Sequence, residues 1–359
     1  MALLPWLRKA RTKFAGIRQS KHRFPLDAQE FRREANRERV RADRSHTHLA
    51  ILVIELPADR RKGRDFAFLF NLLSQRLRVT DTAGQLPDAR VAVLFPDTRK
   101  DGAWKVASDI CDHYPLGHGR PNCEVFLYPD ESVSFDDESQ PRTKQPAESH
   151  DNRLESLFAN PTPMLKRGVD IIGAIVGLIV SAPVLVVLAA LIKITSRGPV
   201  IYSQWREGHG GRLFRIYKLR TMSVDAHERQ PLLQAHSEQD GPAFKMRHDP
   251  RTTAVGGLLR RTSLDELPQL WNVLVGDMSL VGPRPLPTRE SLQCLPWQRQ
   301  RLLVLPGLTC IWQVKGRSTV TFIEWMRMDV QYVRRRSLLR DLQLLLATGP
   351  SILLTKGPR

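Results

Sequence analysis

The sequence predicts an α+β protein with a small N-terminal α/β domain, then a membrane-associated helix, then a mostly helical and irregular C-terminal domain. Three observations support this. Strand-length apolar runs alternate with helical runs over residues 45–129. An apolar run with a single charge covers residues 169–192. Residues 199–359 combine helical patterns with frequent Gly, Pro and Arg. A chain of 359 residues has room for two ordinary domains.

The charge balance indicates an anionic partner. Lys+Arg 55 against Asp+Glu 37 gives a formal net charge of +18, which favours nucleic acid, lipid headgroups or phosphorylated substrates. No helix-turn-helix, zinc or aromatic-stacking motif occurs, so nucleic acid is not expected. The 4 cysteines form no CxxC pair, which favours a reducing compartment over a zinc or disulfide scaffold.

Residues 1–44 are predicted to form a basic helical arm. They hold 13 Lys/Arg and 5 Asp/Glu, and the start of the chain has no sustained apolar core typical of a secretory signal. The run FRREANRERVRADR is typical of an exposed helix of mixed charge. Either the arm is solvated, or it contacts anionic lipid with help from Leu3, Leu4 and Trp6.

The next two segments contrast in polarity. Within residues 45–129, HLAILVIEL, RVAVLF and CEVFLY predict strands, while DFAFLFNLLSQRL and DGAWKVASDICDHY predict helices. Such alternation implies a sheet covered by helices. Residues 130–160 are acidic and rich in Ser, Pro and Gln, so they are predicted to be a disordered linker.

The apolar run 169–192 predicts a re-entrant membrane helix. Pro183 removes a helix hydrogen bond, so a kink or break is expected near Ser181 and Pro183. Each half of about 12 residues would rise roughly 18 Å, too short to cross a bilayer alone. Cations flank both ends, which favours two cytoplasmic ends; they are Lys166, Arg167, Lys193 and Arg197. An ordinary kinked transmembrane helix is the alternative.

Adjacent carboxylates in SLDELPQLWNVL form the first candidate site. Pro268 belongs in the first turn of a helix, so a helix is expected to begin near Asp265, with this carboxylate at the N-cap. The helix dipole would favour its ionised, nucleophilic form, and Glu266 beside it would suit a divalent metal. The residues alone also fit a capping box that begins at Thr262 or Ser263.

Three motifs in order settle the choice. GRLFRIYKLRTM, HDPRTTAVGGLLRRTSLDELPQLWNVLVGDMSLVGPRP and LPGLTCIWQVKGRS resemble the bacterial sugar transferase family, the monotopic polyprenyl-phosphate phosphoglycosyl transferases. The long middle motif is highly specific. The resemblance begins at Met164 and runs to the C-terminus, so residues 161–359 are assigned as a sugar transferase domain.

The resemblance implies a specific reaction and location. Asp265 would attack the β-phosphorus of a UDP-sugar, giving a covalent phosphosugar-enzyme that polyprenyl (undecaprenyl) phosphate then displaces. Glu266 would bind Mg²⁺. The enzyme would act at the cytoplasmic face of the bacterial inner membrane, against anionic lipid, and start exopolysaccharide or O-antigen synthesis. The rival hypothesis is a non-catalytic, membrane-tethered signalling protein, and a homo-oligomer stays open.

Further candidates lie inside the motifs. Expected phosphate contacts are Lys218, Arg220, Arg284 and Arg317, because arginine offers phosphate oxygens a planar fork. Gln313 is a candidate for facing the nucleotide. Arg260 and Arg261 are expected at the surface or facing the membrane. Cys310 stands where the family usually has Gly, so a side chain there would narrow the site. Residues 322–354 follow a long helical pattern with apolar and basic residues interleaved.

Residues 31–128 resemble a degenerate GGDEF-type diguanylate cyclase domain. PDARV, from Pro87 to Val91, replaces the signature Gly-Gly-Asp-Glu-Phe, so no cyclase activity is expected. Arg78 and Asp81 stand where that family has a cyclic-di-GMP site, and a salt-bridged helix end is the simpler interpretation.

Overall fold

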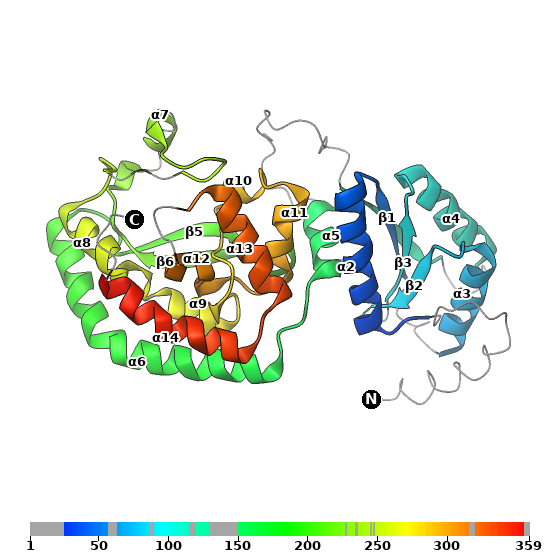
Figure 1. Ribbon diagram of the computed structural model, residues 1–359, viewed down its shortest axis with the longest axis horizontal. Helices are drawn as coiled ribbons and strands as arrows, with labels where there is room; N and C mark the ends of the chain where they lie inside the picture. The colour runs from blue at the N-terminus through cyan, green and yellow to red at the C-terminus, as the bar shows by residue number, and fades with distance from the viewer. Residues whose placement is uncertain are drawn as a thin grey trace. The chain divides into compact units, whose positions relative to one another are not determined.

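The computed structural model describes residues 25–56, 63–86, 90–114, 120–129, 150–226, 228–233, 236–244, 246, 248–315 and 320–354. Contacts within the chain separate two units, Met1–Gln140 and Pro141–Arg359 (Figure 1). Both contain helices and strands, as the α+β class requires. The expected lipid contacts of the arm at Leu3, Leu4 and Trp6 lie outside the described residues.

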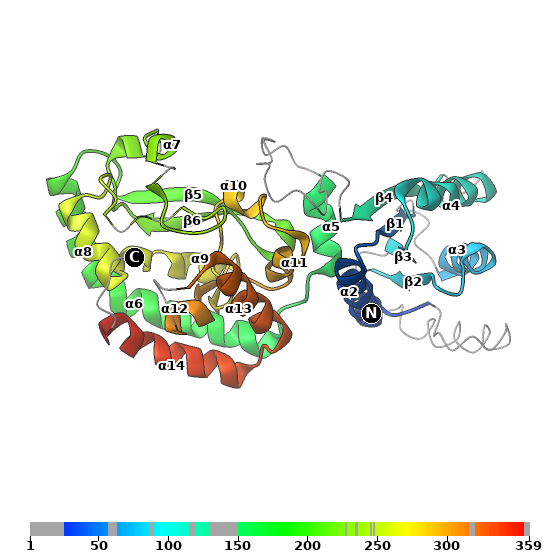
Figure 2. The same cartoon turned by 45° about the horizontal axis from the view of Figure 1, so that its top comes forward.

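The first unit is built on a four-stranded antiparallel sheet in the order β2-β3-β1-β4. The strands are β1 (Leu49–Glu55), β2 (Thr82–Gln85), β3 (Arg90–Pro96) and β4 (Asn122–Tyr128). Helices α3 (Gly63–Arg76) and α4 (Lys100–His113) cover one face, and α2 (Ala28–Ser45) covers the other (Figures 1 and 2). The sequence predicted each of these strands except the short β2.

Helix α2 is not the exposed arm that its charge suggested. Phe31, Ala35, Arg39 and Ala42 recur every three or four residues and are buried on one face. Phe31 is 0% exposed, and a Cβ on Gly84 of β2 would lie 2.7 Å from it. The arm prediction was therefore wrong from residue 28 onward, because one apolar face among the charges is enough to seat a helix on a sheet.

The linker prediction also extended too far. Within the segment 130–160, residues His150–Phe158 form α5, with Leu154, Leu157 and Phe158 buried in the second unit. Glu155 is buried as well and pairs with Arg299 at 3.0 Å. The sequence analysis missed this helix because only three apolar residues within five positions mark it in an otherwise polar segment.

In the second unit, a β-hairpin and several helices lie on one side of a long helix, α6 (Met164–Thr195). The hairpin consists of β5 (Ile201–Glu207) and β6 (Leu213–Leu219), and β7 (Ser279–Val281) pairs in parallel with β8 (Gly307–Thr309). The other α-helices are α7 (Gln230–Leu233), α8 (Ala254–Thr262), α9 (Gln269–Val275), α10 (Thr288–Ser291), α11 (Pro296–Arg299), α12 (Ile311–Lys315), α13 (Phe322–Arg334) and α14 (Leu338–Leu354). Short 3₁₀ turns are η4 (His209–Gly211), η5 (Val224–Ala226), η7 (Leu264–Glu266) and η8 (Gln300–Leu303).

Helix α6 is continuous through Pro183, so the chain does not break at Ser181 and Pro183, and of the predicted kink or break only the kink remains. A proline removes one backbone hydrogen bond while neighbouring turns keep theirs, and the result here is a helix whose ribbon bends along its course (Figure 1). It has 32 residues and is long and apolar enough to cross a membrane, with only 17% of its most apolar window buried. Exposed residues on it include Ile172, Ile179 and Val187.

The first basic flank of α6 is used inside the protein. Lys166 donates to Asp341 of α14 at 2.6 Å, and Arg167 donates to the carbonyls of Val273 and Leu274 at the end of α9, at 2.6 and 2.7 Å. These two cations therefore say less about membrane topology than the sequence suggested, because their charges already have partners.

Helix α9 lies between the hairpin and α6 (Figure 2). The side-chain amide of Asn272 in α9 makes two hydrogen bonds to the backbone of β6. It donates to Arg215 O at 2.7 Å and accepts from Tyr217 N at 3.2 Å. Towards α6 the approach is close at two glycines. A Cβ on Gly173 would lie 2.5 Å from Leu280 Cδ1, and one on Gly177 would lie 3.0 Å from Leu270 Cδ1.

Candidate active site

The carboxylate pair lies in a turn between two helices rather than at a helix start. Helix α8 ends at Ser263, whose φ of 61° is left-handed, and η7 follows with Asp265 and Glu266. Helix α9 begins after Pro268, and no side chain caps it. The expected N-cap role of Asp265 was therefore wrong. The capping box is equally absent, because Ser263 makes no side-chain cap bond in this turn.

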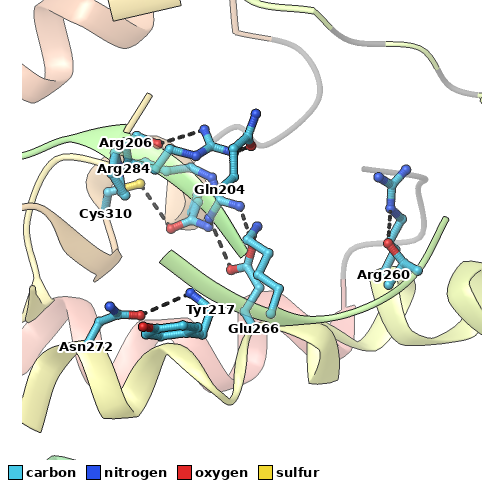
Figure 3. A network of polar contacts seen from close by, with 12 residues as sticks. Gln204, Arg206, Tyr217, Arg260, Glu266, Asn272, Arg284 and Cys310 are labelled. Carbon is cyan, nitrogen blue, oxygen red and sulfur yellow. Dashed lines mark hydrogen bonds and ion pairs between the residues drawn. The ribbon is translucent and has the colours of Figure 1, made fainter. Parts of the chain in front are cut away.

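Glu266 gathers two cations. It accepts from Lys218 Nζ at 2.9 Å, and Arg284 donates both terminal nitrogens to it, Nη1 at 3.1 Å from Oε2 (Figure 3). Lys218 comes from the end of β6, and Arg284 follows β7. The three side chains are thus brought together from positions 48 and 18 residues apart in sequence. Two of the four expected phosphate contacts, Lys218 and Arg284, lie in one cluster.

Asp265 is the unsatisfied member of the pair. It is 6% exposed, and its Oδ1 is buried without a hydrogen-bond partner among the described residues. Burial and the neighbouring negative charge of Glu266 raise its pKa, while Lys218, Arg260 and Arg284 act in the opposite direction. The helix-dipole expectation of a readily ionised Asp265 is corrected: burial is the largest influence, and three cations favour the charged form.

Arg260 was expected at the surface or facing the membrane, and it is half-buried. It donates to Thr221 Oγ1 at 3.1 Å and to Thr252 Oγ1 at 3.3 Å. Burial lowers its pKa, and the charge of Asp265 is the largest opposing influence. Arg260 therefore belongs to the electrostatic surroundings of Asp265, although Figure 3 shows it apart from the Glu266 cluster.

Arg220 has a different role from the one expected. Its guanidinium donates to Ser196 O at 3.0 Å, to Ser196 Oγ at 2.9 Å and to Arg197 O, all at the C-terminal end of α6. A cation that satisfies the last carbonyls of a helix also opposes the negative end of its dipole. The structure thus uses Arg220 to anchor the end of α6, and its contact with phosphate stays a prediction.

Of the remaining candidates, Gln313 and Cys310 are in contact with each other, and Arg317 is not among the described residues. Gln313 of α12 is buried and accepts from Cys310 Sγ at 3.0 Å. Burial raises the pKa of the Cys310 thiol, so it remains a neutral, space-filling group near Arg284. Arg317 lies outside the described residues.

Sequence reasoning missed Arg206 of β5. Its Nη1 donates to Pro285 O at 3.1 Å and its Nη2 to Gln204 Oε1 at 2.8 Å (Figure 3). Burial lowers its pKa to about 10. A signal was present, because Gln204 and Arg206 share one face of a strand, and Lys218 pairs with Tyr202 on that same face.

The residues as they stand do not fit a metal bound by Glu266. Both of its oxygens already accept from Lys218 and Arg284. Across the described residues, no group of three or more His, Cys, Asp and Glu side chains lies close enough together to hold an ion. Mg²⁺ at Glu266 would require these ion pairs to open. The free oxygen in the pair belongs to Asp265.

The site thus joins Asp265, whose buried Oδ1 has no hydrogen-bond partner among the described residues, to Glu266, which binds two cations, in a unit that carries a long exposed apolar helix. Residues 161–355 match the model of the bacterial sugar transferase family, and the chain belongs to that family.

Relatives with curated names carry related activities. The galactosyl transferase CpsE of Streptococcus agalactiae is 44% identical over 54% of this chain, and the UDP-glucose:undecaprenyl-phosphate glucose-1-phosphate transferase of Caulobacter vibrioides is 42% identical over 53%. The exopolysaccharide production protein ExoY of Rhizobium meliloti is 37% identical over 54%. The chain spans 43% of the length of CpsE, 70% of the Caulobacter protein and 88% of ExoY.

The first unit has structural neighbours of a different kind. A diguanylate cyclase (DGC) protein from Thermotoga maritima matches 29% of this chain and 82% of its own, with a TM-score of 0.27 and 18% identity. The GGDEF domain of PA1120 from Pseudomonas aeruginosa matches 30% of this chain and 78% of its own, with a TM-score of 0.25 and 20% identity.

Proposed function

We propose that the second unit transfers a hexose-1-phosphate from a UDP-sugar to polyprenyl phosphate, with Asp265 as the nucleophile. The observation that carries this proposal is the unpartnered, buried oxygen of Asp265 next to a carboxylate that holds two cations. Buried polar atoms usually have hydrogen-bond partners. Asp170 Oδ2 is another buried carboxylate oxygen without one, but the Asp265 oxygen lies next to a carboxylate that binds two cations. Two relatives are named for the same class of reaction: an undecaprenyl-phosphate galactose phosphotransferase of Salmonella typhimurium and the glucose-1-phosphate transferase of Caulobacter vibrioides.

The reaction balances as two displacements at one phosphorus. An Asp265 oxygen bonds to the β-phosphorus while the bond from that phosphorus to the bridging oxygen breaks, and UMP leaves with that oxygen. A phosphate oxygen of the polyprenyl acceptor then bonds to the same phosphorus and releases the Asp265 carboxylate. The product is polyprenyl-diphospho-sugar, and the first intermediate is a mixed anhydride on Asp265.

The cations of the site have a defined task in this scheme. Lys218 and Arg284 are pre-positioned by Glu266, so they can bind the diphosphate without further ordering. Arg260 stabilises the ionised form of Asp265.

The test is UMP release by the full chain in detergent or nanodiscs, with undecaprenyl phosphate and a panel of UDP-hexoses and UDP-N-acetylhexosamines. Turnover with at least one donor is expected, and the panel identifies the sugar. Folded protein that releases no UMP from any donor would favour the non-catalytic, membrane-tethered alternative.

We also propose that the site works at the cytoplasmic face of the inner membrane, with both ends of α6 on that side. The bend in α6 and the cations Lys193 and Arg197 after its apolar part support this topology. Single cysteines near residues 150 and 200 in a cysteine-free background should both resist impermeant maleimides in intact cells. Labelling of one position alone would show that α6 spans the membrane.

A further inference from the structure

Arg284 lies in a loop whose first part is fixed by backbone pairing. Gly282 N donates to Thr309 O at 3.0 Å, and Gly307 N donates to Pro283 O at 2.8 Å. A Cβ on Gly282 would lie 2.3 Å from Leu305 O, and one on Gly307 would lie 2.0 Å from Gly282 N. Only glycine permits this approach, so the chain is held against β8 up to the residue before Arg284.

The next two carbonyls are held by arginine side chains. Arg301 of η8 donates Nη2 to Arg284 O, and Arg206 donates Nη1 to Pro285 O at 3.1 Å. Arg301 also donates Nε to Asp329 Oδ2 of α13 at 3.0 Å. Arg301 is 2% exposed and Asp329 is 1% exposed, so the pair is withdrawn from water.

We propose that Arg301 and Asp329 are positioning residues that hold the main chain of Arg284 so that its guanidinium stays on Glu266, beside the nucleophile. This inference rests on the proposed function and assigns a role in it to two residues that do not touch the substrate. Asp329 fixes the Arg301 fork, the fork fixes the Arg284 carbonyl, and the carbonyl fixes where the Arg284 side chain starts.

The cost of burying this ion pair supports a positioning role. Two charges withdrawn from water gain little net stability compared with apolar residues of similar volume, so stability alone explains the pair poorly. Lysine would not replace Arg301, because a point-like ammonium lacks the planar fork that binds a carboxylate with one edge and a carbonyl with another nitrogen.

The chain supplies a matched control two residues away. Arg299 forms a similar buried pair, with Nε 3.0 Å from Glu155 Oε1 and Nη2 2.9 Å from Glu207 Oε1. These hydrogen bonds and two further ones join Arg299 to Glu155, Glu207 and the carbonyl of Ser291. Glu155→Gln therefore weakens a buried arginine pair in the same unit without touching the proposed chain of contacts.

The experiment compares Arg301→Lys, Asp329→Asn and Glu155→Gln in the full chain, with kcat and KM for the UDP-sugar measured beside thermal unfolding. We expect Arg301→Lys and Asp329→Asn to lower kcat about 10- to 100-fold, as small misplacements of a catalytic group do, with KM changed less than kcat. Glu155→Gln is expected to lose stability while its kcat stays near that of the wild type. If Asp329→Asn does not fold, the kcat of Arg301→Lys alone tests the inference, because this variant retains the positive charge that pairs with Asp329.

A double-mutant cycle with Arg284→Lys separates positioning from a general loss of structure. If Arg301 acts through Arg284, adding Arg301→Lys to Arg284→Lys costs little more than Arg284→Lys alone. Losses that multiply, or an Arg301→Lys variant with wild-type kcat, would overturn this inference alone. A wild-type protein without any turnover would overturn the proposed function and this inference with it.

Discussion

The two units of this chain differ in what they bury. In the first, the described core is apolar on both sheet faces, and Arg39 is the single buried charge there. The second buries many charged side chains: Glu155, Lys166, Asp170, Glu207, Arg220, Arg251, Asp265, Glu266, Arg299, Arg301, Asp329 and Asp341. Buried charge contributes little to stability and must be paired. In this unit most of these charges join elements that are distant in sequence, and the Asp265–Glu266 pair lies among them.

The sharpest test of this contrast is Asp265→Asn. The substitution keeps the shape of a side chain whose Oδ1 has no partner among the described residues, and it removes the nucleophile. We expect UMP release to fall by at least about 1,000-fold, with the melting temperature nearly unchanged. Mass spectrometry of enzyme trapped with donor should find the phosphosugar adduct on the peptide TSLDELPQLWNVLVGDM in the wild type only. An adduct on another residue would move the nucleophile elsewhere.

A second substitution, Glu266→Gln, distinguishes two roles for Glu266: positioning the side chains of Lys218 and Arg284, or binding a metal ion. Since Glu266 holds Lys218 and Arg284, its loss should lower kcat about 100-fold through disorder of those cations. Raised Mg²⁺ or Mn²⁺ should then give no rescue. Recovery of activity at high metal concentration would show instead that Glu266 is a metal ligand and that its ion pairs open when substrate binds.

The pH profile tests the electrostatics of the pair. Asp265 must be ionised to attack, and burial and Glu266 raise its pKa. Activity should therefore fall on the acid side at a higher pH than an ordinary aspartate would cause. Glu266→Gln removes a neighbouring negative charge, so in its residual activity the acid limb should shift to lower pH. An unshifted limb would mean that another group or step controls it.

The smallest effect on activity is expected in the first unit. Phe31→Ala removes a ring that is 0% exposed and should destabilise this unit by about 3 kcal/mol or more. UMP release should remain within twofold of wild type, and Val79→Ala, at a residue 80% exposed, serves as the control without a stability loss. A large loss of activity in Phe31→Ala would show that the catalytic unit depends on the first one.

The sequence predicted the parts of this molecule that depend on local pattern. The strands at 49–55 and 90–96 and the family followed from local sequence patterns and motifs. What it missed depends on distant partners. The apolar face of α2 becomes recognisable only against the sheet. Arg220 and Arg284 both stand in arginine-containing motifs, but Arg220 bonds the end of α6 and Arg284 bonds Glu266. They differ because Arg220 follows β6 and Arg284 follows β7, and these strands end beside different neighbours.

The same limit applies to the C-terminal helical pattern. It proved to be two helices, α13 and α14, separated at residues 335–337. Asp341 at the start of α14 binds Lys166 and the hydroxyl of Tyr332, so a buried polar contact sets the corner. The hydrophobic periodicity predicted the apolar faces of α13 and α14, but it contained no information about the contact of Asp341 with Lys166 and Tyr332.

The close approach at Gly173 and Gly177 has a consequence for assembly. Two glycines spaced by three residues on an apolar helix commonly form the contact through which membrane helices pair. In this chain that face of α6 is already filled by Leu270 of α9 and by Leu280 of β7. A second copy therefore has no access to it. Any dimer formed within the lipid must pair through the opposite, larger side chains such as Ile179 and Val186, or through parts of the protein outside the bilayer.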